Sequence, residues 1–64
     1  MKKLHDNLAG TFRRFGVLGP VYEILSPLRK ANAKGGKMYK IRVPESGEVA
    51  VIDAEAILAD PVAD

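Results

Sequence analysis

Few residues of this 64-residue chain have the chemistry of a catalytic site. Nucleophilic catalysis needs a hydroxyl or thiol group held beside a general base. The chain has no cysteine and one histidine, His5, which falls in an N-terminal stretch that we expect to be an arm. Ser26 and Ser46 are expected in turns, with no base nearby in the sequence. We therefore expect no catalytic residue and predict that the protein is not an enzyme.

Four carboxylates near the C-terminus, Asp53, Glu55, Asp60 and Asp64, are the group that most suggests a metal ion. Their spacing is not that of a calcium loop, and the first two point in different directions on a helix. Gly35-Gly36-Lys37 is not a phosphate loop either, because the first glycine and the following Ser or Thr are missing. We expect no metal, no cofactor and no small-molecule substrate.

Basic residues concentrate in the first part of the chain and provide a nucleic-acid alternative. Residues 1–44 have ten Lys or Arg and two acidic residues, a net charge of +8, whereas residues 45–64 have six acidic residues and no basic one. The two parts can attract each other within the fold. An acid-free basic run is also typical of a nucleic-acid-binding surface. The candidate binding residues of this run are Arg29, Lys30, Lys34, Lys37, Lys40 and Arg42.

The apolar segment over residues 49–52 provides the favoured hypothesis, a protein-interaction or regulatory module. Alternation along a strand places Ile52 on the opposite face from Val51. An exposed apolar side chain beside a strand edge favours a partner strand or a second copy, so Ile52 is a candidate binding residue. In the alternative, Ile52 packs within the fold under the N-terminal arm. We expect a protein partner or a homo-oligomer ahead of nucleic acid.

A β-hairpin over residues 37–53 must position these side chains. Apolar residues alternate with Lys40 and Arg42, as in a strand with one buried face. Glu45-Ser46-Gly47 suits a three-residue loop with Gly47 in the left-handed region. That loop predicts Val43 opposite Val49, Ile41 opposite Val51 and Tyr39 opposite Asp53. The aliphatic residues then share the buried face, and the other face presents Lys40, Arg42, Ala50 and Ile52.

The rest of the chain adds two strands and a helical turn. Strands are predicted over residues 11–15 and 21–25, a polar loop over 28–36, and a helical turn over 54–59 that begins after the N-cap Asp53 and ends at Asp60-Pro61. We interpret residues 1–9 as a flexible arm or short helical turn, with one helix over 3–14 as the alternative. Residues 10–62 form a single small β domain. The predicted fold class is mainly β, a small curved antiparallel sheet or SH3-like partly open barrel of about four strands with a short C-terminal helical turn.

No targeting signal is predicted from the sequence. Two lysines near the N-terminus precede no apolar run, so no signal peptide is predicted. No segment approaches the roughly 20 apolar residues of a membrane span, and a chain without cysteine fits a reducing compartment. We expect a soluble cytoplasmic protein that does not act at a membrane.

Four phrases of the sequence resemble a group of short uncharacterised bacterial proteins, which are catalogued as a domain of unknown function. They lie at residues 10–16, 19–25, 41–48 and 57–61 and include Gly-Pro-Val-Tyr-Glu and Ile-Arg-Val-Pro-Glu-Ser-Gly-Glu. After this last phrase the group often has an acidic and aromatic segment, where this chain has the apolar residues 49–52. The resemblance spans residues 10–62. It implies a bacterial or phage source and a cytoplasmic setting, and it supplies no catalytic or binding residue.

Overall fold

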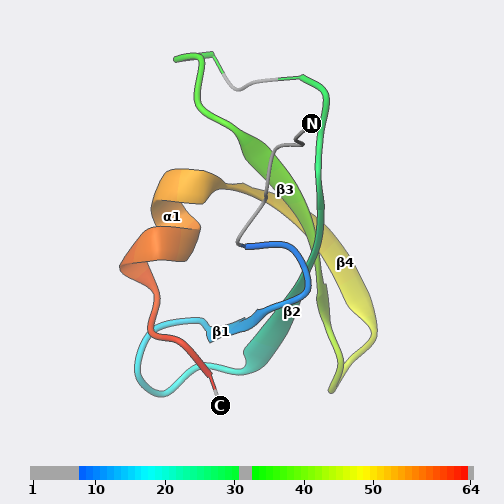
Figure 1. Cartoon of the computed structure of the whole chain (residues 1–64). Coiled ribbons are helices and arrows are strands. Elements are labelled where there is room, and N and C mark those ends of the chain that lie inside the picture. Colours follow the sequence, from blue (N-terminus) through cyan, green and yellow to red (C-terminus); the bar gives the residue numbers. More distant parts are fainter. Residues whose placement is uncertain (1–7, 31–32, 64) are drawn as a thin grey trace.

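A four-stranded antiparallel sheet with a short helix against one face is the architecture of the protein in the computed structural model, which describes residues 8–30 and 33–63 (Figure 1). The strands lie side by side in chain order and the sheet is open. The predicted mainly β fold with a short C-terminal helix is confirmed. The elements are β1 (Phe12–Arg14), β2 (Val21–Pro27), β3 (Met38–Val43), β4 (Glu48–Asp53) and α1 (Ala54–Ala59).

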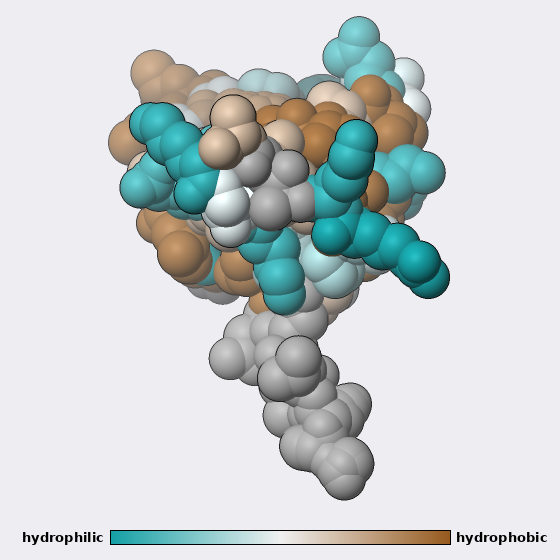
Figure 2. All heavy atoms as spheres, turned by 90° about the horizontal axis from the view of Figure 1, so that it is seen from above, coloured by the Kyte–Doolittle hydropathy of each residue, from teal (hydrophilic) through white to brown (hydrophobic). Residues whose placement is uncertain are grey.

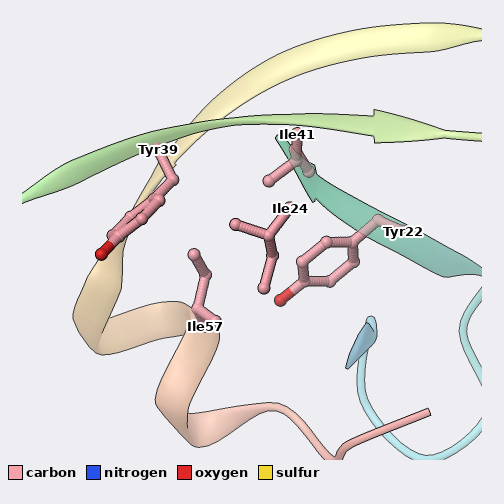
Figure 3. Close-up of a cluster of buried hydrophobic side chains, with 5 residues drawn as sticks. All are labelled: Tyr22, Ile24, Tyr39, Ile41 and Ile57. Carbon is pink, nitrogen blue, oxygen red and sulfur yellow. The ribbon is translucent and has the colours of Figure 1, made fainter. Parts of the chain in front are cut away.

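The core lies between α1 and the face of the sheet that we call the inner face. Alternation along the strands turns two side chains of β2 and two of β3 toward the helix, and one isoleucine of α1 meets them (Figure 3). All five are buried, and a domain of this size has few others to bury. These core residues are Tyr22, Ile24, Tyr39, Ile41 and Ile57.

Asp53 is the N-cap of α1, as predicted. Its backbone is extended, and its Oδ1 atom accepts the N–H of Ala56 at 2.8 Å. The helix ends at Ala59, because the N–H of Asp60 donates to the carbonyl of Ile57 and the following residue is Pro61. The cap and the proline therefore fix the two ends of the helix that supplies Ile57 to the core.

The β3–β4 hairpin has a different register from the predicted one. Its loop has four residues, 44 to 47, and the N–H groups of Ser46 and Gly47 both donate to the carbonyl of Val43, at 3.2 and 2.7 Å. Gly47 has the expected left-handed φ, 80°. The predicted pairing of Val43 with Val49 is wrong by one residue. The observed pairs are Val43 with Glu48, Arg42 with Val49, Ile41 with Ala50, Lys40 with Val51, and Tyr39 with Ile52.

Pro44 explains the longer loop. Proline has no N–H for a strand ladder, and its fixed φ suits the second position of a type I turn, so the loop begins one residue earlier than predicted. Because side chains alternate, this shift turns Val49 and Val51 away from the core and turns Ile52 toward it. Ile52 packs against the core. Its predicted exposure is wrong, and it packs within the fold instead.

Smaller differences lie at the ends of the other strands. β2 continues past the predicted end at residue 25 to Pro27. The N–H of Leu28 donates to the carbonyl of Met38 at 2.8 Å. Because backbone groups alternate in direction along a strand, the backbone nitrogen of the neighbouring Pro27 points away from β3, and its missing N–H breaks no ladder bond. β1 falls within the predicted strand 11–15.

The N-terminal end of the described chain is a turn. The N–H of Thr11 donates to the carbonyl of Leu8 at 3.1 Å, and the N–H of Gly10 donates to Ile24 on β2 at 2.8 Å. Leu8 is partly buried against the core. The alternative of one helix over 3–14 is therefore wrong for residues 8–14, and the predictions for residues 1–7 lie outside the described residues.

Candidate functional site

The face of the sheet turned away from α1, which we call the outer face, combines apolar and charged side chains. One row crosses all four strands, with Phe12 opposite Glu23, Glu23 opposite Arg42, and Arg42 opposite Val49. The apolar side chains are exposed, Phe12 by 39%, Val49 by 53% and Val51 by 47%. The outer face is defined by Phe12, Glu23, Lys40, Arg42, Val49 and Val51.

The charges at the centre of the outer face largely cancel. Arg42 Nη2 lies 3.0 Å from Glu23 Oε1, and the two side chains are 47% and 26% exposed. An ion pair this open to water contributes at most about 1 kcal/mol. Among the described residues no carboxylate pairs with Lys40. Lys40, beside Val51, is thus an uncompensated positive charge on the outer face.

One edge of the sheet is closed by the C-terminal tail, residues 61–63. The N–H of Arg14 on β1 donates to the carbonyl of Pro61 at 3.0 Å, and the N–H of Ala63 donates to the carbonyl of Phe12 at 3.1 Å. Arg13 and Val62 face each other as an antiparallel bridge. The tail therefore acts as a short extra strand that occupies the backbone groups of β1.

The other edge, β4, pairs with β3 alone among the described strands. The N–H of Ala54 donates to the carbonyl of Lys37 at 2.8 Å. Because hydrogen-bonded and non-hydrogen-bonded pairs alternate in an antiparallel ladder, even-numbered residues of β4 point their backbone groups toward β3. The N–H and C=O groups of Val49 and Val51 consequently point outward. The edge offers a complete set of donors and acceptors beside two exposed valine side chains.

Asp60 is the centre of a polar network at the opposite side of the molecule. Its Oδ2 atom accepts the hydroxyl of Tyr22 at 2.7 Å, and its Oδ1 atom accepts the N–H of Gly16 at 3.2 Å. Its carbonyl accepts Nη1 of Arg13 at 2.9 Å. The centres of the Phe15 and Tyr22 rings lie 4.3 Å apart. Both carboxylate oxygens are used to join the tail to the β1–β2 region, so this network is structural.

Burial raises the pKa of the Tyr22 hydroxyl, and its hydrogen bond to Asp60 raises it further. The folded state then holds this proton more tightly than the unfolded state, in which the pKa of tyrosine is about 10. The Tyr22 contribution to the free energy of unfolding is complete below that pH and is lost as pH rises above it.

We expect the stability of the wild-type protein to fall more steeply above about pH 10 than that of Tyr22→Phe. Urea unfolding monitored by circular dichroism between about pH 9 and about pH 11 measures the difference. All other residues are the same in both proteins, so the comparison isolates Tyr22. Parallel losses of stability would contradict the prediction.

The predicted basic residues do not form one surface. Lys34 and Lys37 line a hollow of about 360 Å³ together with Asp53 and Glu55, so acidic groups lie among them. Lys40 and Arg42 are on the outer face, whereas the exposed Arg29 and Lys30 follow the end of β2. Figure 2 views the end of the molecule that bears the β2–β3 loop, where hydrophilic side chains project in several directions with apolar surface between them.

A larger, open hollow of about 690 Å³ lies beside the β1–β2 turn. Its lining includes Arg14, Val21, Pro44 and Glu45. Nη1 of Arg14 donates to the carbonyl of Gly19 at 3.2 Å. Its described lining has a single arginine and a single glutamate, which do not make a nucleophile and base pair.

Across residues 8–30 and 33–63, no three His, Cys, Asp or Glu side chains gather to hold a metal ion. Within the same ranges, no helix is long and apolar enough to cross a membrane. His5 and Asp64 lie outside the described residues.

The fold and its edges define a small, mainly β protein built on an open antiparallel sheet, with one edge closed by its own tail. The chain belongs to the family of unknown function DUF5397, whose model matches residues 1–64. This confirms the predicted resemblance and extends it over the whole chain. No curated protein matches the sequence.

Sequence reasoning missed the residues that make the outer face apolar. Val49 and Val51 were predicted inside and lie outside, and Phe12 was not singled out. Pro44 was the available signal, because a proline before Glu-Ser-Gly indicates a four-residue loop and shifts β4 by one residue. The closure of β1 by the tail joins residues about 50 positions apart, a separation that local patterns do not predict.

Proposed function

We propose that this protein is a non-enzymatic protein-interaction or regulatory module of a bacterial or phage cytoplasm, and that its partner adds a strand at the open edge of β4. One observation carries the proposal. The tail closes the β1 edge, whereas no described strand pairs with the outward side of β4.

The composition of β4 supports this proposal. Edge strands are usually protected by lysine, proline, a bulge or a covering segment, since unpaired backbone groups invite another strand. The two charged residues of β4 (Glu48–Asp53) lie at its ends, residues 49–52 between them have no charge and no Pro, and the ladder with β3 runs without a bulge. An edge with none of these features is suited to strand addition.

The outer face defines the chemistry of the incoming strand. Side chains of that strand on the outer side would lie about 4.5–5.5 Å from Val49 and Val51, the distance of cross-strand pairs. Apolar residues at alternate positions would cover the valines. The partner segment is therefore extended and apolar on one face.

We expect a double variant, Val49→Lys with Val51→Lys, to lose partner binding, because it places two charges on the edge strand. A matched control, Val17→Lys with Leu18→Lys, changes two exposed residues of the β1–β2 turn, 81% and 96% exposed. Immobilised wild-type protein, variant and control are compared in capture from lysate of the source cell. A protein retained by wild type and control and lost by the edge variant supports the proposal. Equal retention by all three, together with no self-association of the purified protein through β4, would refute it.

Nucleic-acid binding stays a prediction that a titration can test. Since the basic residues are dispersed and partly paired with acids, we expect labelled DNA and RNA to bind weakly, with little change between two salt concentrations. Tight binding at low salt that is abolished by replacing Lys34, Lys37 and Arg42 with Ala would favour the nucleic-acid alternative.

A further inference from the structure

The hydrogen-bonding pattern of the β4 edge is complementary to itself, and we infer that its occupant is a second copy of this chain, paired antiparallel about a two-fold axis at Ala50. The inference rests on the proposed function, because it uses the same edge and names the partner. It joins two four-stranded sheets into one continuous sheet.

The backbone fixes this register. Val49 and Val51 are the residues that point both backbone groups outward, as the bond from Ala54 to Lys37 shows. With the axis at Ala50, Val49 of each copy lies opposite Val51 of the other. Each such pair exchanges two hydrogen bonds, so all the outward groups of both valines are satisfied.

Neighbouring registers are less favourable. An axis at Val51 would pair Val49 with Asp53, whose side chain caps α1 and whose carbonyl accepts the first bond of that helix. An axis at Val49 would place the loop residue Gly47, with φ of 80°, opposite Val51. The axis at Ala50 keeps the paired residues inside the strand and places a small side chain at the close central contact.

The side chains agree with the same pairing. Four valines, two from each copy, become neighbours on the outer face and cover one another, and Glu48 faces Ile52. No like charges lie directly opposite. Lys40 and Arg42 sit on β3, so the basic groups of the two copies are three strand spacings apart, roughly 14 Å. At that separation salt screens most of their repulsion.

The small core gives the dimer a physical role. Five buried hydrophobic residues form it within residues 8–30 and 33–63, and the chain has no cysteine for a disulfide. Small domains commonly gain stability from oligomerisation. A seam of six-residue strands falls short of the about 800 Å² per partner of a stable interface. We therefore expect a reversible dimer with a dissociation constant on the order of 10 to 100 µM.

Sedimentation velocity over a range of about 5 µM to 1 mM tests the association. The wild-type protein and the Val17→Lys with Leu18→Lys control are expected to shift from monomer to dimer. Val49→Lys with Val51→Lys is expected to dissociate at least about tenfold more readily. Circular dichroism of each variant is the check that it is folded.

Disulfide capture tests the register without relying on the edge variant. Cα atoms at the central non-hydrogen-bonded pair lie about 4.5 Å apart, within disulfide range. Ala50→Cys, in a chain with no other cysteine, is expected to form a covalent dimer under mild oxidation at protein concentrations near the dissociation constant. Glu48→Cys, which faces Ile52, and Leu58→Cys on α1 are the matched controls and are expected to cross-link far more slowly.

A protein that stays monomeric to about 1 mM and does not cross-link at Ala50→Cys would overturn the second-copy inference. A dimer that forms without cross-linking at Ala50→Cys, or that survives the edge variant, would overturn it as well, because another surface would then be used. Neither result by itself refutes the proposed function, because a foreign protein that the comparative capture retains through β4 would still support it.

Discussion

Replacing Ile57 with alanine is expected to remove a large share of the free energy of unfolding at 25 °C. Ile57 is fully buried and is the residue by which α1 meets the core residues of β2 and β3 (Figure 3). Removing such a side chain costs about 2–5 kcal/mol. A domain of this length has a total stability of about 3–10 kcal/mol. The variant therefore loses a large share of the free energy of unfolding.

Urea unfolding monitored by circular dichroism measures this loss as a lower midpoint. Leu58→Ala is the matched control, since it makes a similar truncation one residue along the same helix at a side chain that is 63% exposed. Its free energy of unfolding should change by about 0.5 kcal/mol or less. Similar losses for the two variants would show that α1 does not pack as the structure describes.

Asp60→Ala is expected to cost about 2–3 kcal/mol of stability. The change removes the acceptor of the buried Tyr22 hydroxyl at 2.7 Å and the acceptor of the Gly16 N–H at 3.2 Å. A buried donor without a partner costs more than the bond was worth, because the unfolded chain still has water to bind. Asp60→Asn has the same shape but one acceptor oxygen instead of two, so its stability should fall between that of the wild-type protein and that of Asp60→Ala.

The coupling between Tyr22 and Asp60 separates this explanation from a general disturbance of the tail. Tyr22→Phe removes the donor, so adding Asp60→Ala to it should cost about 1 kcal/mol less than Asp60→Ala costs in the wild-type protein. Unfolding curves of the two single variants and the double variant give this number. Strictly additive losses would contradict a direct hydrogen bond of any energetic weight.

Local patterns predicted the elements because each depends on neighbouring residues. The period-two alternation marked β3 around Lys40 and Arg42, and Asp53 with Pro61 marked both ends of α1. The register of β4 depends on a choice between two loop lengths that share Gly47 at the same position. The prediction buried Val49 and Val51 and therefore used the shorter loop. The fixed φ of Pro44 favours the longer loop, which the structure has.

The candidate site was less predictable for two reasons. The one-residue shift turned Ile52 against the core and brought Val49 and Val51 out beside Lys40. The contacts that close β1 and join Tyr22 to Asp60 link residues 38 or more positions apart. Such contacts follow from the assembled sheet, so no pattern within a short window of sequence contains them.

Closure of the β1 edge by the tail sets the valence of the molecule. A sheet with two open edges can accept a strand on each side and grow into a filament, whereas a sheet with one open edge is saturated by a single partner. The bonds from Arg14 to Pro61 and from Ala63 to Phe12 thus prevent a further strand from pairing with β1. Sedimentation profiles of the wild-type protein should accordingly contain no species larger than two copies.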